Sequence, residues 1–210
     1  MTRKTTVYLL LLLPLVTSAC VRAVVTGSQI AKEITGLHRN TDQASADLKL
    51  EKLLRNSIET GRKSFLNTNN LSDFGYYDLK VMEGRVLLTG IVFDRQTKGY
   101  LVDKITKNLK VRELLDEVTI EEKRGLVWMR TRDYFLEKNV GMRIFFKSKI
   151  KSLNYEISSI NRKVYVVGIA EDRKEHELLT KIISTVDGVM EVISYVITID
   201  NPKKLKVEYI

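Results

Sequence analysis

The chain carries one pattern twice, and this repeat limits the folds that it can adopt. Residues 86–120 align without a gap with residues 164–198, and ten of the 35 aligned pairs are identical. Upstream, residues 47–58 align with residues 133–144. A copy of this length can bury a modest hydrophobic core of its own. We therefore expect two tandem domains with the same fold.

Each copy predicts the element order helix, strand, strand, helix, strand. Asp47 and Asp133 are expected to cap the first helices, because apolar residues follow three, seven and eleven positions later, on one helical face. Short polar turns at 83–85 and 161–163 join two β-rich segments. The order predicts an α+β fold, αββαβ, with two helices packed on a three-stranded mixed sheet. The expected strands are 77–82, 86–93 and 114–120, and then 155–160, 164–170 and 192–199.

The N-terminus has the layout of an export signal. Two basic residues precede a short apolar run, Val7–Val16, and small residues precede Cys20. The run is about half of the ~20 residues that a membrane-spanning helix needs. The stretch VTSAC resembles the lipobox of bacterial lipoproteins, although Thr17 stands where leucine is usual. The resemblance implies a thioether-linked lipid on the sulfur of Cys20 and cleavage before that residue; the alternative is an ordinary secretory signal with a free thiol.

These features divide the chain and exclude some partners. We expect a lipoprotein signal peptide at 1–19, a lipidated tether at 20–46, a first domain at 47–121, a linker at 122–130, a second domain at 131–200 and a basic tail at 201–210. The net charge is +9, but the first domain has 13 basic and 12 acidic residues and the second 11 and 10. Neither domain is strongly basic, so nucleic acid is disfavoured as a partner.

Two motifs resemble the BON domain, a family named after bacterial osmotic-stress and nodulation proteins. The run V-x-L-x-G-x-V occurs at Val86–Val92, and GV-x-x-V occurs at Gly188–Val192. The first copy has Lys110 where the glycine of the second motif is expected. Two copies behind a lipobox resemble the dual-BON lipoproteins of the outer membrane. This resemblance implies a protein on the periplasmic face of that membrane that binds anionic phospholipid, supports membrane integrity, and has no enzymatic activity or cofactor.

The first helix of the second copy carries an apolar stripe that its counterpart lacks. The stripe lies more than about 90° from the predicted buried face, and residues 131–151 hold six basic and two acidic side chains. An apolar stripe with a basic border suits a membrane interface. In the BON lipoproteins that the chain resembles, a lipid-inserting aromatic follows the helix-capping Asp by two residues, as Phe135 does here. The candidate lipid-binding residues are Phe135, Lys138, Met142, Arg143, Phe146 and Lys149.

Three partners could cover this stripe: the neighbouring domain, a membrane or another protein. A second apolar helix face is most often buried against a neighbouring domain or the linker. Gly141 in mid-helix, which costs about 1 kcal/mol relative to alanine, indicates close packing there. The alternative function is therefore a structural adaptor of the envelope whose BON domains bind other envelope proteins or further copies of the chain.

The sequence shows no arrangement typical of catalysis or metal binding. His38 and His176 lie in different segments without a ligand cluster, and we expect them to be solvated. Asp94 and Asp172 follow strands at equivalent places and are expected to cap the second helices. Trp128 lies between the two domains and is expected to pack at their junction.

Overall fold

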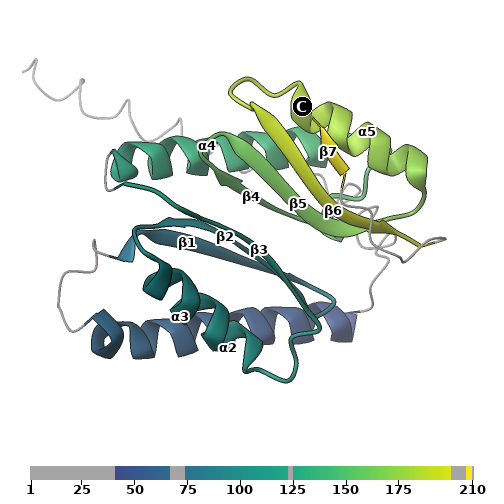
Figure 1. The fold of residues 1–210 in the computed structure, drawn as a ribbon. Helices are drawn as coiled ribbons and strands as arrows, with labels where there is room; N and C mark the ends of the chain where they lie inside the picture. The colour runs from purple at the N-terminus through teal and green to yellow at the C-terminus, as the bar shows by residue number, and fades with distance from the viewer. Residues whose placement is uncertain (1–40, 67–73, 123–124, 200–206, 210) are drawn as a thin grey trace, which may run out of the picture. The chain divides into compact units, whose positions relative to one another are not determined.

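The computed structural model describes residues 41–66, 74–122, 125–199 and 207–209 (Figure 1). In the first domain β1 pairs antiparallel with β2, and β2 pairs parallel with β3. Two helices, α2 and α3, lie on one face of this sheet (Figure 1). The elements are α2 (Thr41–Leu66), β1 (Tyr76–Met82), β2 (Arg85–Val92), α3 (Arg95–Thr106) and β3 (Glu113–Ile120).

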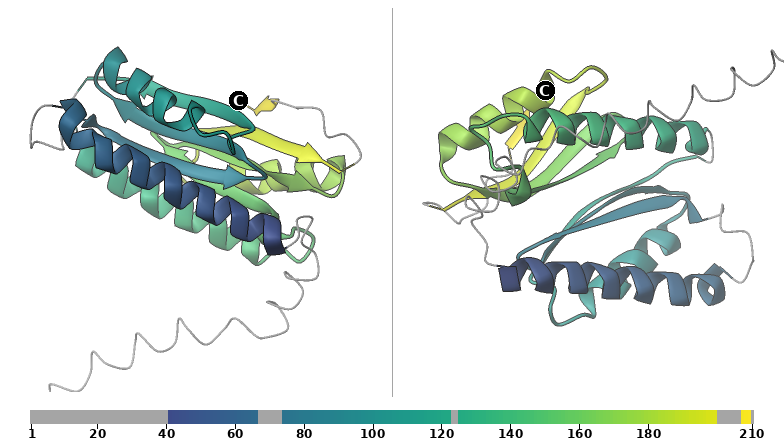
Figure 2. Two further views of the ribbon diagram at one scale, coloured as in Figure 1. Left: turned by 90° about the horizontal axis from the view of Figure 1, so that it is seen from below. Right: turned by 180° about the vertical axis from the view of Figure 1, so that it is seen from behind.

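The second domain repeats this order and adds one strand. Its helices α4 and α5 again cover one face of a mixed sheet, ordered β4-β5-β6-β7 (Figure 2). The predicted α+β fold of two tandem αββαβ units is confirmed, whereas the fourth strand, β7, which pairs antiparallel with β6, was not predicted. The elements are α4 (Leu126–Phe145), η2 (Ser152–Asn154), β4 (Tyr155–Ile160), β5 (Lys163–Ala170), α5 (Arg173–Ser184), β6 (Glu191–Thr198) and β7 (Val207–Tyr209).

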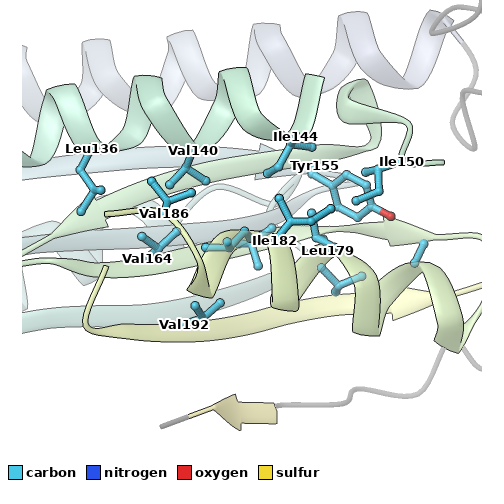
Figure 3. Close-up of a cluster of buried hydrophobic side chains, with 14 residues drawn as sticks. Leu136, Val140, Ile144, Ile150, Tyr155, Val164, Leu179, Ile182, Val186 and Val192 are labelled. Carbon is cyan, nitrogen blue, oxygen red and sulfur yellow. The ribbon is translucent and has the colours of Figure 1, made fainter. Parts of the chain in front are cut away.

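The expected helix faces form the cores. In the second domain Leu136, Val140 and Ile144 point from α4 into a cluster with residues of β5, β6 and α5 (Figure 3). The equivalent residues of α2 are buried in the same way in the first domain. Each such side chain contributes roughly 1.5–3 kcal/mol on full burial. These residues therefore fix which side of each first helix faces its sheet.

Asp47 and Asp133 do not cap helices, contrary to expectation, because α2 and α4 begin six and seven residues earlier. Asp133 is buried, and its carboxylate accepts hydrogen bonds from the backbone N–H groups of Asn161 at 2.6 Å and Arg162 at 3.1 Å. These two turn residues have φ of 47° and 66°, a left-handed conformation that L-residues seldom adopt. Asp47 binds the turn at 83–84 in the same manner. In each copy, the aspartate on the first helix thus binds the turn of the β-hairpin, although 36 residues separate Asp47 from its turn and 28 separate Asp133 from its turn.

The helix-free faces of the two sheets meet in a third core. Strand β2 is buried along its whole length because alternate residues face the helices and the other domain. Polar bonds accompany the apolar contacts: the hydroxyls of Thr89 and Ser158 lie 2.7 Å apart, and Arg85 donates to the carbonyl of Tyr195 at 2.8 Å. The cluster contains Tyr76, Met82, Leu87, Ile91, Leu115, Ile160, Tyr165, Val167 and Ile193.

The expected caps of the second helices are confirmed. Asp94 accepts a hydrogen bond from the Thr97 N–H, and Asp172 accepts one from the Glu175 N–H. Within the described ranges no helix has the length and apolar character needed to cross a bilayer. The predicted signal peptide, Cys20 and His38 lie outside the described residues.

Candidate functional site

The predicted apolar stripe on α4 is exposed. Phe135, Met142 and Phe146 keep 60%, 56% and 53% of their surface accessible. Packing of this stripe beneath the first domain, one of the three expectations, is therefore wrong for the described part of the chain. The buried side of α4 faces its own sheet, as Figure 3 shows for Leu136 and Val140, so the stripe faces away from the core.

The stripe is longer than predicted. Trp128 is 71% exposed and lies seven residues before Phe135, which itself lies seven residues before Met142. Seven residues make nearly two helical turns, so these three side chains share one face of α4. The expectation that Trp128 packs at the junction is wrong: Leu126 and Met129 pack against the interdomain cluster instead.

Trp128 was missed because the start of the helix was misplaced. If Asp133 caps the helix, Trp128 lies in the preceding linker. Helical spacing then cannot assign its side chain to a helix face. Helix α4 begins instead after Gly125, whose φ is 62°. The seven-residue spacing of Trp128, Phe135 and Met142 was the available signal.

Open grooves run between α4 and the segment that connects α5 to β6. One encloses about 400 Å³ and the other about 410 Å³, and Asn139 and Asp187 border both. Apolar and basic side chains alternate along them, so the site offers shallow apolar space beside cationic groups. Trp128, Arg132, Phe135, Leu136 and Gly188 line the first groove, and Met142, Arg143, Phe146, Lys147 and Val186 line the second.

The basic border of the stripe is mostly uncompensated. Among the described residues no carboxylate lies within ion-pair distance of Arg143, Lys147 or Lys149, and all three are exposed. Lys138 differs, because its ammonium lies 3.5 Å from the Glu137 carboxylate and 5.2 Å from the centre of the Tyr134 ring. The positive charge is therefore concentrated toward the C-terminal end of α4, where it also complements the helix dipole.

Gly141 does not mark a close contact, contrary to expectation. A Cβ placed there would meet no described atom within 4 Å. The structure offers no packing reason for glycine at this position.

His176 is buried rather than solvated, which corrects the prediction. Its side chain is 3% exposed, and its Nε2 atom lies 2.8 Å from the Ser194 hydroxyl. Burial lowers the pKa of His176 below its ordinary value. Within the described ranges no group of three or more His, Cys, Asp or Glu residues could hold a metal ion.

Comparison with known proteins identifies the family. Residues 136–201 match the family model described as BON domain. The "uncharacterized protein in gshII 5'region" of Anaplasma centrale is 32% identical over 124 residues, which are 59% of this chain and 82% of the relative. The chain belongs to the BON-domain family. Its first domain lies outside residues 136–201 but has the same αββαβ order, so the protein contains two tandem BON-like domains.

Two further comparisons each cover more than two thirds of the chain. The outer membrane lipoprotein DolP of Haemophilus influenzae is 25% identical over 175 residues, which are 83% of this chain and 86% of the relative. A solved structure of CdsD, a structural protein of the type III secretion system of Chlamydia trachomatis, has 11% identity and a TM-score of 0.28. That match covers 72% of this chain and 92% of the CdsD chain.

Proposed function

We propose that this BON protein is a non-catalytic lipoprotein, anchored at Cys20 on the periplasmic face of the outer membrane, that binds anionic phospholipid through α4 and supports membrane integrity. The exposed stripe on α4 is the observation that carries the proposal. It places three aromatic side chains and one methionine on one helix face, next to cations that pair with no carboxylate among the described residues. The protein acts by adhesion to lipid, so it needs no cofactor.

The physical basis is interfacial insertion of an amphipathic helix. Full burial of one large apolar side chain contributes roughly 1.5–3 kcal/mol. Each basic residue near an anionic bilayer contributes about 1 kcal/mol. The exposed halves of Trp128, Phe135, Met142 and Phe146, together with the cations Arg143, Lys147 and Lys149, therefore support reversible binding.

The location rests on the N-terminus and on the relatives. The apolar run before Cys20 and the small residues at the cut resemble a lipoprotein signal, and one relative is named an outer membrane lipoprotein. Several acyl chains on one cysteine hold a protein stably at a bilayer, since each buried CH₂ contributes about 0.8 kcal/mol. Globomycin sensitivity of processing, combined with membrane fractionation, tests the anchor: mature chain in the inner-membrane fraction, or processing that globomycin does not affect, contradicts this part of the proposal.

Flotation with vesicles tests lipid binding by α4. The chain without residues 1–19 and with Cys20→Ser is expected to float with phosphatidylglycerol vesicles but not with phosphatidylcholine vesicles. Phe135→Glu is expected to abolish flotation, because it places a charge in the middle of the stripe. Met190→Glu is the matched control: Met190 is 67% exposed but lies outside both α4 grooves, so this variant should still float.

Two outcomes contradict the proposal. Flotation of Phe135→Glu equal to that of Met190→Glu would remove α4 from the binding surface. Absence of flotation by the parent chain, with the fold intact by circular dichroism, would favour the adaptor function, in which the stripe binds envelope proteins or another copy of the chain.

A further inference from the structure

The connection between α3 and β3 in the first domain differs sharply in charge from its counterpart. Residues 104–112 hold four basic and no acidic side chains, whereas the aligned residues 182–190 hold no basic residue and one aspartate. At the centre of the basic segment stands Leu109, which is 100% exposed. It aligns with Asp187 of the second copy. The first domain thus presents an apolar tip between cations where the second presents an acid.

Backbone hydrogen bonds hold this tip in place. The Val111 N–H donates to the Asn108 carbonyl at 3.0 Å, and the Arg112 N–H donates to the Gly84 carbonyl at 2.8 Å. The Asn108 side chain in addition accepts from the Lys110 N–H at 3.0 Å. Leu109 is therefore displayed by a defined loop conformation, and its exposure is a property of the fold.

The cations beside Leu109 keep most of their charge available to a partner. Lys107 pairs with Asp103 at 2.7 Å, but on the exposed surface, where such pairs contribute little. Arg112 donates to the backbone carbonyl of Glu83, which leaves its charge uncompensated. Among the described residues Lys110 has no carboxylate within ion-pair distance and is exposed. The loop thus presents one exposed apolar side chain with three exposed cations around it.

The loop also lies next to the start of the first helix. Leu109, Lys110 and Arg112 share the lining of a groove of about 430 Å³ with Gln43 and Ala46, which belong to the first two turns of α2. Twenty residues separate Cys20 from Thr41, where α2 begins. A fully extended chain of that length reaches at most about 70 Å. An anchor at Cys20 therefore allows this end of the first domain to reach the bilayer.

We propose that residues 107–112 form a second membrane-contacting element, which inserts Leu109 into the acyl boundary of an anionic bilayer while Lys107, Lys110 and Arg112 meet the phosphates. A single exposed apolar side chain on a loop can enter a fluid bilayer, whereas a protein partner needs an extended complementary surface. The inference rests on the proposed function for the anchor at Cys20, but it concerns a different domain from the α4 site.

A single-tryptophan reporter tests the insertion. Trp128 is the only tryptophan of the chain, so Trp128→Phe combined with Leu109→Trp places the sole indole in the loop. With vesicles that contain phosphatidylglycerol, the fluorescence of this variant should shift to the blue and be quenched by lipids brominated near the headgroup. The matched control combines Trp128→Phe with Lys174→Trp, an exposed position on α5, and should show neither effect.

A charge variant provides an independent measurement. Lys110→Glu removes one cation and adds one anion, and at about 1 kcal/mol per charge it should weaken partition into the anionic vesicles by about thirtyfold. Its circular dichroism and urea midpoint should match those of the parent chain, because Lys110 is exposed. A partition coefficient within twofold of the parent would contradict the inference.

The two proposals fail in different ways. If the indole at position 109 is not quenched while Phe135→Glu still abolishes flotation, the loop does not insert and the α4 site stands. If the indole is quenched while Phe135→Glu floats normally, the loop binds lipid and the α4 site is wrong. Absence of any vesicle binding by the parent chain overturns both.

Discussion

The buried carboxylate of Asp133 provides the sharpest test of how the second domain is held together. We consider Asp133→Asn, which changes one atom and leaves the size of the side chain almost unchanged. The carboxylate accepts from two backbone N–H groups of the turn, at 2.6 and 3.1 Å, and from the Tyr76 hydroxyl at 3.3 Å. An amide has only one oxygen, so its NH₂ group must face one of these donors.

The size of the effect follows from these bonds. A hydrogen bond to a charged group contributes about 1.5–3 kcal/mol, and a buried donor left without a partner costs about 1–3 kcal/mol. Loss of one turn bond should therefore lower the free energy of unfolding by about 3 kcal/mol. The turn residues Asn161 and Arg162 add to this, because the carboxylate helps to hold them at positive φ.

Urea denaturation followed by circular dichroism measures the change, with Asp187→Asn as the matched control. Asp187 is exposed, so the same chemical change there should alter the free energy of unfolding by less than about 0.5 kcal/mol. If Asp133→Asn were as stable as Asp187→Asn, the carboxylate would not be what fixes the hairpin.

Two further predictions concern buried polar groups. Because burial lowers the pKa of His176, protons bind preferentially to the unfolded chain, and folding stability should fall by up to about 1.4 kcal/mol per pH unit as the pH drops below 6.5. His176→Gln should lose this part of the pH dependence, and urea midpoints at pH 7.5 and 5.5 that move equally in both proteins would contradict it. In the interdomain core, Thr89→Val and Ser158→Ala should show a coupling energy of about 1 kcal/mol in a double-mutant cycle, because each single change already removes the hydrogen bond between the two hydroxyls. Strict additivity of the two changes would mean that this hydrogen bond contributes nothing.

The parts of the fold that depend on local patterns could be predicted from the sequence. The structure confirms the elements that local signals predict. These signals are the internal repeat, the helical spacing of apolar residues, the β-rich segments and the helix caps at Asp94 and Asp172. The role of Asp133 could not be found in this way, because its partners lie 28 and 29 residues away. Aspartate can cap a helix or accept hydrogen bonds from a distant turn, and only the tertiary structure distinguishes these two roles.

The candidate site was predicted in part for the same reason. Helical spacing placed Phe135 and Met142 on a separate face, but it could not show whether the other domain covers that face. The long apolar strands indicate which surface the other domain covers. Residues of β2 and β5 alternate between the core under the helices and the core between the domains. Strands that are apolar on both faces indicate that the helix-free side of each sheet is also buried, in this protein against the other sheet.

That shared core has a consequence for the history of the gene. Deletion of either copy would expose the apolar, helix-free sheet face of the remaining domain, which includes Leu87 in the first domain and Tyr165 in the second. The remaining domain would then be prone to aggregation. Once two ancestral modules had joined in this way, neither could be discarded or exchanged alone. A substitution in this shared core is therefore constrained by both domains, whereas the exposed sides of the helices face no such constraint.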